Sequence, residues 1–459
     1  MANGGEPPRR PDEHQSPSRA HSVRSAEERA GHAWLALTPA RRLIAAAALW
    51  AVATLPVLSR LAIGRAAGDL TVFQSGAEAL LHGPRVYREV AFEYPPYALL
   101  WFLPPHALSH DLEGFRLAFG LEMWAADAVI KALLLWLGVR NRTGLRDLVP
   151  FMAYSLGSAA LGHVLLQRFD LIPAVLTLGA TLAVAGGRAL SGGVLVAIAA
   201  GTKLYPALVV PMLAVFAWQR GRGGLMRFAA GAALASLPLI AAALWVPWWR
   251  FVSYHVGRGL QVESPLASIV WALHFAGVPA GWELMWRTHE VTGPLAVRLV
   301  GPGRLLWIVA TLAGVAAATS TAWRLGSRMG ARRSRQVPVA DMAVVLLLPI
   351  AAFVATNTVL SPQFHLWLLP LAALALTAPP HAPEAAGGSA TTVPAEARRA
   401  AWYIVAATLI VPAFYPHREF ATGLGPLLTA VLLLRNGLLI YAAVCLWVAV
   451  RKMGRAAAV

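Results

Sequence analysis

The stretch from Gly68 to Pro96 carries polar side chains between two strongly apolar segments of the chain. It begins with the carboxylate of Asp69 and closes on Glu93 and Tyr94, just before two prolines. A carboxylate beside a membrane surface can act as a general base, because it can take a proton from a hydroxyl that attacks an activated carbon. An Asp near a helix start also serves as an ordinary cap, and this structural alternative stays open. We predict a folded external loop with Asp69 as its catalytic base.

Further ionisable residues lie between apolar runs, where a charge is costly and is a functional candidate by default. Lys203 could neutralise the charge on a phosphate leaving group. A structural lysine whose side chain extends to the membrane interface is the alternative. Arg168 and Asp170 form an acid–base pair at a predicted helix start. A local ion pair explains that pattern as well as a catalytic role does.

Residues 254–264 and the start of a later apolar run supply the remaining candidates. Polar side chains of this kind can bind sugar hydroxyls and phosphate, although a solvated loop would also contain them. A lone His at a run start is as often a packing residue as a site residue. The side chains concerned are those of Tyr254, His255, Arg258, Glu263, Gln363 and His365.

The sequence carries no recognisable cofactor motif. It has neither a Walker A loop nor a dinucleotide fingerprint, so ATP-driven and nicotinamide chemistry are unsupported. No spacing of His, Asp and Glu indicates a metal site, although a divalent ion shared by external carboxylates stays an open alternative. The single Cys445 excludes an intrachain disulfide and a cysteine-based metal site. We expect no cofactor.

The composition is that of a membrane protein, since 58% of the 459 residues are hydrophobic and only 13% are charged. The net charge of +17 could suggest a nucleic-acid partner. The Arg residues instead form short clusters between apolar runs, which is the pattern of positive-inside topology. We therefore expect the lipid bilayer as a partner and no nucleic acid.

The apolar runs predict an all-α, polytopic transmembrane protein of about 12 spans with a large first external loop. One ambiguity is the run 95–109, which either spans the membrane or lies in its interface as a helix. We favour the interface because Pro95-Pro96 and Pro104-Pro105 break this short run. The runs fall at 43–60, 95–109, 115–138, 149–166, 170–186, 189–201, 204–218, 228–247, 303–326, 340–357, 363–378, 401–417 and 425–450.

The chain divides into a tail and one membrane domain. Residues 1–40 are polar and lack an apolar core, which predicts a disordered cytoplasmic tail without a signal peptide. Residues 41–459 form the membrane domain, with 61–94 and 248–302 as large external loops and 379–399 as a cytoplasmic linker. With the Arg clusters inside, both termini are cytoplasmic and the polar motifs extracytoplasmic in a plasma-membrane protein.

The order of these motifs resembles glycosyltransferase family 87, over roughly residues 43–450. The pair Gly162-His163 departs from the Gly-Gln that family members often have. The resembling motifs are Asp69-x-x-Val72-Phe73, Gly83-x-x-Val86-Tyr87, Phe92-x-Tyr94-Pro95-Pro96, Lys203-Leu204-Tyr205-Pro206, Tyr254-His255, Arg258 to Ser264, Ser361-Pro362-Gln363 and Trp367-Leu368-Leu369-Pro370.

The resemblance implies a GT-C fold and an inverting transfer of a sugar from a polyprenyl-phosphate donor on the extracytoplasmic side. Family members are similar to actinobacterial mannosyltransferases and arabinofuranosyltransferases that act on cell-envelope glycolipids or glycans; mannose is our first expectation. By this resemblance Asp69 is the base. Contacts to the donor phosphate or sugar are expected from Lys203, His255, Arg258, Glu263, Gln363 and His365, with support from Glu93, Tyr94, Arg168, Asp170 and Tyr254.

Two other functions compete with this interpretation. A transporter or flippase for a polyprenyl-linked sugar would also combine many helices with buried charges. Its polar residues should cluster near the midplane in broken helices, whereas these fall near one face. A non-catalytic membrane scaffold would leave the convergence of external polar motifs unexplained.

Overall fold

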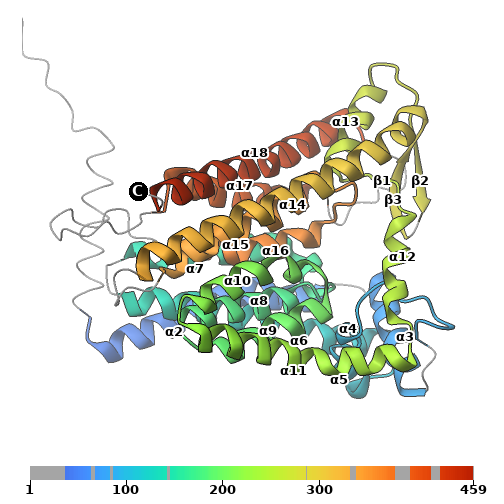
Figure 1. Cartoon of the computed structure of the whole chain (residues 1–459). Helices are drawn as coiled ribbons and strands as arrows, with labels where there is room; N and C mark the ends of the chain where they lie inside the picture. The colour runs from blue at the N-terminus through green and yellow to red at the C-terminus, as the bar shows by residue number, and fades with distance from the viewer. Residues whose placement is uncertain are drawn as a thin grey trace, which may run out of the picture.

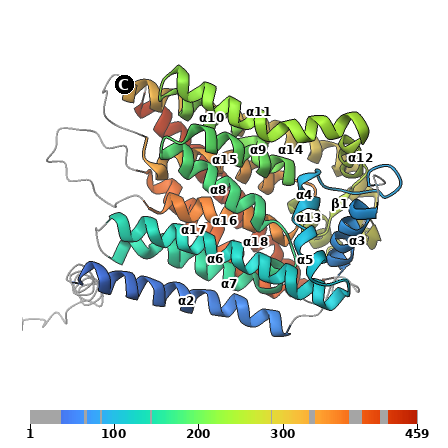
Figure 2. The same ribbon diagram turned by 90° about the horizontal axis from the view of Figure 1, so that it is seen from below.

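The computed structural model describes residues 37–63, 68–82, 86–141, 145–285, 287–330, 337–377, 393–414 and 424–457. Long helices run side by side between two ends of the molecule (Figure 1). The C-terminus lies at one end, and helices α3 to α5 lie at the other together with a small sheet (Figure 1). The start of α2 lies at the same end as the C-terminus in both views (Figures 1 and 2).

The regular elements described in the first half of the chain are helices, apart from an isolated bridge between Val86 and Val90. Its elements are α2 (Pro39–Ile63), α3 (Gly68–His82), α4 (Tyr97–Leu100), α5 (Leu103–Leu108), α6 (Leu112–Asn141), η1 (Leu145–Leu148), α7 (Val149–Leu166), α8 (Leu171–Ala185), α9 (Ala189–Thr202), η2 (Tyr205–Val209), α10 (Val210–Trp218) and α11 (Arg222–Trp245).

The second half adds a sheet to the helices. Its elements are η3 (Trp248–Arg250), α12 (Phe251–Val256), β1 (Leu260–Gln261), α13 (Pro265–His274), β2 (Gly281–Met285), β3 (Thr288–Thr292), α14 (Pro294–Gly330), α15 (Val339–Thr356), η4 (Pro362–Phe364), α16 (His365–Ala375), α17 (Ala395–Ile410), η6 (Val411–Ala413) and α18 (Pro426–Ala456).

Six of the described helices are long and apolar enough to cross a membrane, namely α2, α7, α11, α14, α15 and α18. Shorter apolar helices cover 171–185, 189–202, 205–218 and 265–274. The predicted helical membrane protein is therefore confirmed, while about 12 spans stays a prediction. Helix α14 has 37 residues and is roughly 55 Å long, which exceeds the roughly 30 Å of a bilayer core. Its excess length reaches the small sheet (Figure 1).

The centre of the bundle is formed by α15 and α16. The most apolar window of α15 is 83% buried, whereas those of α11 and α2 are 11% and 17% buried. Figure 2 places α2 and α11 at opposite edges, with α16 between them. The apolar outer faces of α2 and α11 are suited to contact with lipid, because every helix satisfies its own backbone groups there.

Inside the bundle, a buried ion pair on one helix also contacts a second helix, and glycines allow two other helices to approach closely. Asp127 and Lys131 are both buried on α6 and form an ion pair of 2.6 Å. The Lys131 ammonium also donates to the carbonyl oxygen of Ala53 on α2, at 2.7 Å. Helices α9 and α11 approach closely at Gly193 and Gly231, where an added Cβ would lie 2.0 and 2.1 Å from backbone oxygens.

The run 95–109 does not form a spanning helix. It folds into α4 and α5, of four and six residues, and six residues of helix reach only about 9 Å. The proline pairs at 95–96 and 104–105 cause the break, because proline lacks an amide donor. That these helices lie in the membrane interface stays a prediction.

The two predicted external loops contain regular structure of their own. The first holds α3, and the second holds α12, α13 and an antiparallel sheet with strand order β1-β3-β2. The all-α class is confirmed for the bundle, and this small sheet is a local addition that was not predicted. Its strands are short and lie between long helices, so hydropathy gave little sign of them. Val291, Thr288 and Thr292 on the central strand are β-branched, which suits a strand.

Candidate active site

Two ion pairs meet at the turn between α7 and α8. Arg168 in this turn pairs with Asp69, which stands in the first turn of α3. Asp170, two residues later, directly precedes α8 and pairs with Lys203 at 2.7 Å. Four of the residues singled out from the sequence are therefore brought together by one turn, although they come from three separate parts of the chain.

The two pairs have different surroundings. The side chains of Asp69 and Arg168 are 26% and 23% exposed, so both groups remain accessible. The carboxylate of Asp170 is almost fully buried. Its Oδ1 accepts from Lys203 Nζ and, at 2.6 Å, from the indole nitrogen of Trp367 at the start of α16. Two donors compensate this buried carboxylate, which makes it a fixed anchor for the ammonium.

Aromatic rings surround the ammonium of Lys203. Its Nζ lies 4.7 Å from the ring centre of Phe169, 5.3 Å from that of Trp367 and 5.4 Å from that of Tyr94. Trp367 is itself stacked between Tyr205 at 4.4 Å and Phe364 at 3.9 Å. A cation held over ring faces in a dry setting is attracted by the ring quadrupoles. Lys203 is thus held rigidly beside the loop that carries Tyr94.

Tyr94 lies at the same centre, and the charges of Glu93 and Arg258 act on its hydroxyl. Loss of hydration raises the pKa of the Tyr94 hydroxyl well above its usual value, and the charges of Glu93 and Asp170 raise it further. Glu93 also accepts a hydrogen bond from this hydroxyl, while the guanidinium of Arg258 acts in the opposite direction on the pKa. The Tyr94 hydroxyl therefore stays protonated and is a neutral donor.

The other predicted site residues lie elsewhere or cannot be placed. Glu263 is bound to Arg435 on α18 at 2.5 Å, in a buried network away from the Lys203 centre. His365 is buried, with Nδ1 3.0 Å from Thr408 Oγ1. Gln363 is partly buried in η4. The side chains of Tyr254 and His255 lie outside the described residues. Contacts of these five residues with substrate stay predictions.

Trp367 and Glu290 were not among the site residues predicted from the sequence. Trp367 stands in a motif that carries the family resemblance, and that motif was the signal available for it. Glu290 lies on β3 and is buried, but its sequence neighbourhood gives no sign of this. In the part of the chain that the structure describes, no group of three or more His, Cys, Asp or Glu residues could hold a metal ion.

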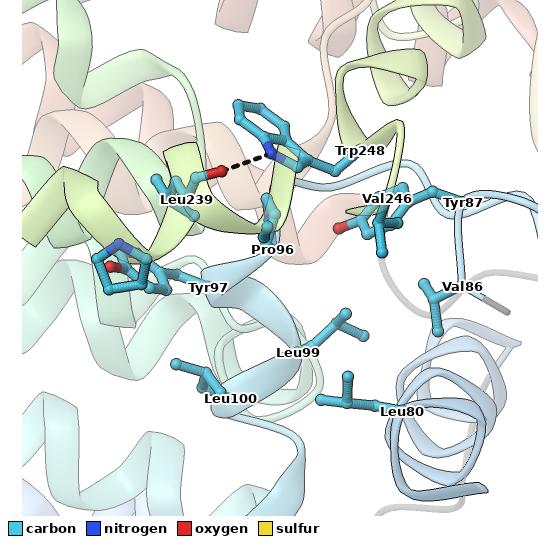
Figure 3. Close-up of a pocket in the computed structure, with 12 residues that line it drawn as sticks. Leu80, Val86, Tyr87, Pro96, Tyr97, Leu99, Leu100, Leu239, Val246 and Trp248 are labelled. Atoms are coloured by element: carbon cyan, nitrogen blue, oxygen red, sulfur yellow. Dashed lines mark hydrogen bonds between the residues drawn. The ribbon is translucent and has the colours of Figure 1, made fainter. Parts of the chain in front are cut away.

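An apolar groove of about 280 Å³ opens beside this centre, between α3, α4 and α11 (Figure 3). Its lining runs to the Lys203 centre through α4. Tyr97 packs against Gly201, and Trp101 donates from its indole to Thr202 Oγ1 at 3.0 Å. The groove is lined by Leu80, Val86, Tyr87, Pro96, Tyr97, Leu99, Leu100, Pro238, Leu239, Ala242, Val246 and Trp248.

Residues 92–292 match the sequence model of glycosyltransferase family 87. This segment of the chain is similar to glycosyltransferase family 87. No curated protein matches the sequence. The match supports glycosyltransferase activity, and the long apolar helices indicate that the protein lies in a membrane. The matched segment contains Tyr94, Arg168, Asp170 and Lys203, whereas Asp69 lies before it, so the role of Asp69 stays a prediction.

Proposed function

We propose that this enzyme transfers a sugar from a polyprenyl-phosphate donor to a glycolipid or glycan hydroxyl, with inversion at the anomeric carbon. The observation that carries this proposal is the turn from Arg168 to Asp170. It joins an accessible carboxylate, Asp69, to a buried ammonium, Lys203, at one end of a membrane bundle. A base and a phosphate-binding cation side by side are what this transfer requires.

Asp69 is the proposed general base. The acceptor oxygen attacks the anomeric carbon, and the proton of the acceptor hydroxyl moves to the Asp69 carboxylate. The bond between the anomeric carbon and the phosphate oxygen breaks, and its electron pair stays on the phosphate. The ion pair with Arg168 supports this assignment, because a guanidinium holds a carboxylate in a fixed orientation. Its partial exposure leaves room for an acceptor.

Lys203 and Tyr94 are proposed to bind the leaving phosphate. An ammonium has three N–H donors, and the contact with Asp170 uses one of them. The protonated Tyr94 hydroxyl has one donor, which would turn from Glu93 to the phosphate. Both groups are fixed by the aromatic rings around them, so little reorganisation is needed as charge develops on the phosphate.

The apolar groove between α4 and α11 is the proposed path of the polyprenyl chain. It is apolar, and its Tyr97 wall leads to the Lys203 centre (Figure 3). A chain lying there would place its terminal phosphate near the ammonium. The active end would face the extracytoplasmic side of the plasma membrane, with both termini in the cytoplasm.

Transfer assays in proteoliposomes test the base and the sugar together. Labelled polyprenyl-phosphate mannose and polyprenyl-phosphate arabinofuranose are offered separately to the wild type and to Asp69→Asn. We expect transfer from the mannose donor and a fall of about 100- to 10,000-fold in Asp69→Asn, the usual contribution of a general base. Transfer from the arabinofuranose donor instead would change the assigned sugar and leave the mechanism intact.

Glu78→Gln is the matched control, since Glu78 is an exposed carboxylate on the same helix α3. It should keep wild-type activity. Transfer by a folded Asp69→Asn variant within about threefold of the wild type would remove Asp69 as the base.

A further inference from the structure

Three buried polar side chains at the small sheet keep atoms without a hydrogen-bond partner. Arg258, Gln261 and Glu290 are 8%, 4% and 1% exposed. Among the described residues, Arg258 Nε, Gln261 Oε1 and Glu290 Oε1 are buried and have no partner. A buried polar atom left without a partner costs about 1–3 kcal/mol, so three in one place require an explanation.

The three side chains are held in place by their remaining contacts. Gln261 on β1 stands directly opposite Glu290 on β3, which puts both side chains on one face of the sheet. Gln261 Nε2 donates to Ser361 Oγ at 3.3 Å. Arg258 Nη2 donates to Thr288 Oγ1 at 3.0 Å. Each group is therefore ordered while one of its polar atoms stays open.

The backbone is shaped around the Glu290 carboxylate. The amide of Gly259 donates to Glu290 Oε2 at 3.0 Å. A Cβ at position 259 would lie 2.7 Å from that same oxygen, so a residue with a side chain would displace the carboxylate. Arg304 from α14 donates to the carbonyl oxygen of Arg258 and fixes the same turn.

The open atoms match the hydroxyls of a sugar. A carboxylate oxygen accepts from one hydroxyl, a guanidinium N–H donates to a second, and an amide oxygen accepts from either. A phosphate would suit Arg258 but would be repelled by Glu290. A hydrophobic ligand would leave all three atoms unpaired.

Arg258 connects this set to the active site. Its charge acts on the Tyr94 hydroxyl, which belongs to the Lys203 centre. It also acts on Glu290 in the sheet. One guanidinium thus acts on both the Tyr94 hydroxyl and the open carboxylate. A sugar bound there would lie next to the reacting groups.

We propose that Arg258, Gln261 and Glu290 form a sugar-specificity subsite that binds adjacent hydroxyls of one sugar ring. This inference rests on the proposed sugar transfer and deepens it. The ring belongs either to the donor or to the acceptor, and the same hydroxyl chemistry serves both. A site built to bind a hydroxyl discriminates strongly against an analogue that lacks it, because its own buried groups are then left unpaired.

The test measures transfer with two series of analogues. One series is octyl mannoside as the acceptor probe, with each hydroxyl replaced in turn by hydrogen. The other is polyprenyl-phosphate mannose altered in the same way. In the wild type, we expect one deoxy compound of one series to react at least tenfold less efficiently. In Glu290→Gln the KM of that series should rise at least tenfold, with a smaller change in kcat, and the deoxy penalty should disappear.

If the lower efficiency of the deoxy compound disappears in the acceptor series, the bound sugar ring is that of the acceptor. If it disappears in the donor series, the ring is that of the donor. Gln261→Ala should raise the KM of the same series. This variant is used instead if Glu290→Gln does not fold. Glu283→Gln is the matched control, because Glu283 stands opposite Glu290 on β2 and is exposed. Unchanged KM values in both Glu290→Gln and Gln261→Ala would overturn the subsite, as would an equal effect of Glu283→Gln.

Direct binding separates the subsite from the proposed reaction. Octyl mannoside and the mannose donor are titrated calorimetrically into detergent-solubilised protein, which requires no turnover. If the wild type transfers no sugar, weaker binding of one compound to Glu290→Gln but not to Glu283→Gln would still support the subsite. Equal binding of both compounds to all three proteins would overturn it, whatever the transfer assay gives.

Discussion

Gln261 and Glu263 stand two residues apart, yet their side chains enter two buried polar networks of opposite character. Glu263 Oε2 accepts from Arg435 Nη1 at 2.5 Å, and its carbonyl oxygen accepts from Arg435 Nη2 at 2.6 Å. Asn436 donates to the same carbonyl oxygen and, at 3.0 Å, to Ser268 Oγ. Among the described residues, this network leaves no buried side-chain atom without a partner.

The network of Gln261, Glu290 and Arg258 is buried as deeply but is incomplete. Burial and residue type are alike in the two networks, so neither property separates a structural role from a binding role. Completion of the hydrogen bonds does separate them. The complete network ties α13 to α18, whereas the incomplete one includes Arg258, whose charge acts on the Tyr94 hydroxyl.

The largest expected effect comes from making one substitution in both networks. Glu263→Gln leaves Arg435 buried without an opposite charge, which should lower the free energy of unfolding by about 3–5 kcal/mol. Glu290→Gln removes a buried charge that has no paired partner within the sheet and should change stability by less than about 1 kcal/mol. Denaturant unfolding in detergent measures both. Equal losses would end the distinction between the networks.

A smaller effect is expected from Gly259→Ala. The added Cβ would meet Glu290 Oε2, so the carboxylate must move and lose the amide contact. Loss of a hydrogen bond to a charged group, about 1.5–3 kcal/mol, corresponds to a rise of roughly tenfold or more in the KM of the sugar that Glu290 binds. Gly301→Ala is the control, since an added Cβ there meets no atom within 4 Å. An unchanged KM in Gly259→Ala would show that the carboxylate position does not matter.

The smallest expected effect is a pH dependence of sugar binding. Burial raises the pKa of Glu290 above its ordinary value, although the Gly259 amide, Arg258 and Arg304 act to lower it. The ionised carboxylate is the acceptor, so binding is complete above this raised pKa and is lost as pH falls through it. His289 and Glu283 are the other titratable neighbours on the sheet. KM measured against pH should rise on the acid side in the wild type and stay flat in Glu290→Gln.

The same pKa shift has the opposite sign for stability. A carboxyl whose pKa is higher in the folded state favours folding when it is protonated. Glu290 therefore lowers stability at neutral pH and stops doing so as pH falls. Unfolding of the wild type and of Glu290→Gln should differ least in acid, which separates loss of sugar binding from loss of the fold.

The bundle was largely predictable from the sequence because backbone groups in lipid must be satisfied within helices. Runs such as 149–166 and 340–357 coincide closely with α7 and α15. The sheet was not predictable, because its strands have two to five residues and no clear alternation. Helix α14 begins at Pro294 rather than near 303, since its first turns lie beside the sheet and are less apolar.

The active-site residues were predictable as a list but not as a geometry. Ionisable side chains between apolar runs are costly in free energy, so Arg168, Asp170 and Lys203 were predicted as candidate site residues. Their pairing depends on how α7, α8 and α9 pack, which no local pattern specifies. The pairing of Glu263 with Arg435 likewise joins residues that are 172 positions apart, and no local pattern links the two. Glu290 was not predicted, because in the sequence a buried glutamate in a short strand looks the same as a glutamate in a solvated loop.

The turn between α7 and α8 has one more consequence. Arg168 and Asp170 are separated only by Phe169, whose buried ring lies against both Tyr94 and Lys203. The proposed proton acceptor and the proposed phosphate cation are therefore tethered to one short piece of backbone. The backbone of this turn therefore helps to set the spacing between the proposed base and the proposed phosphate-binding cation.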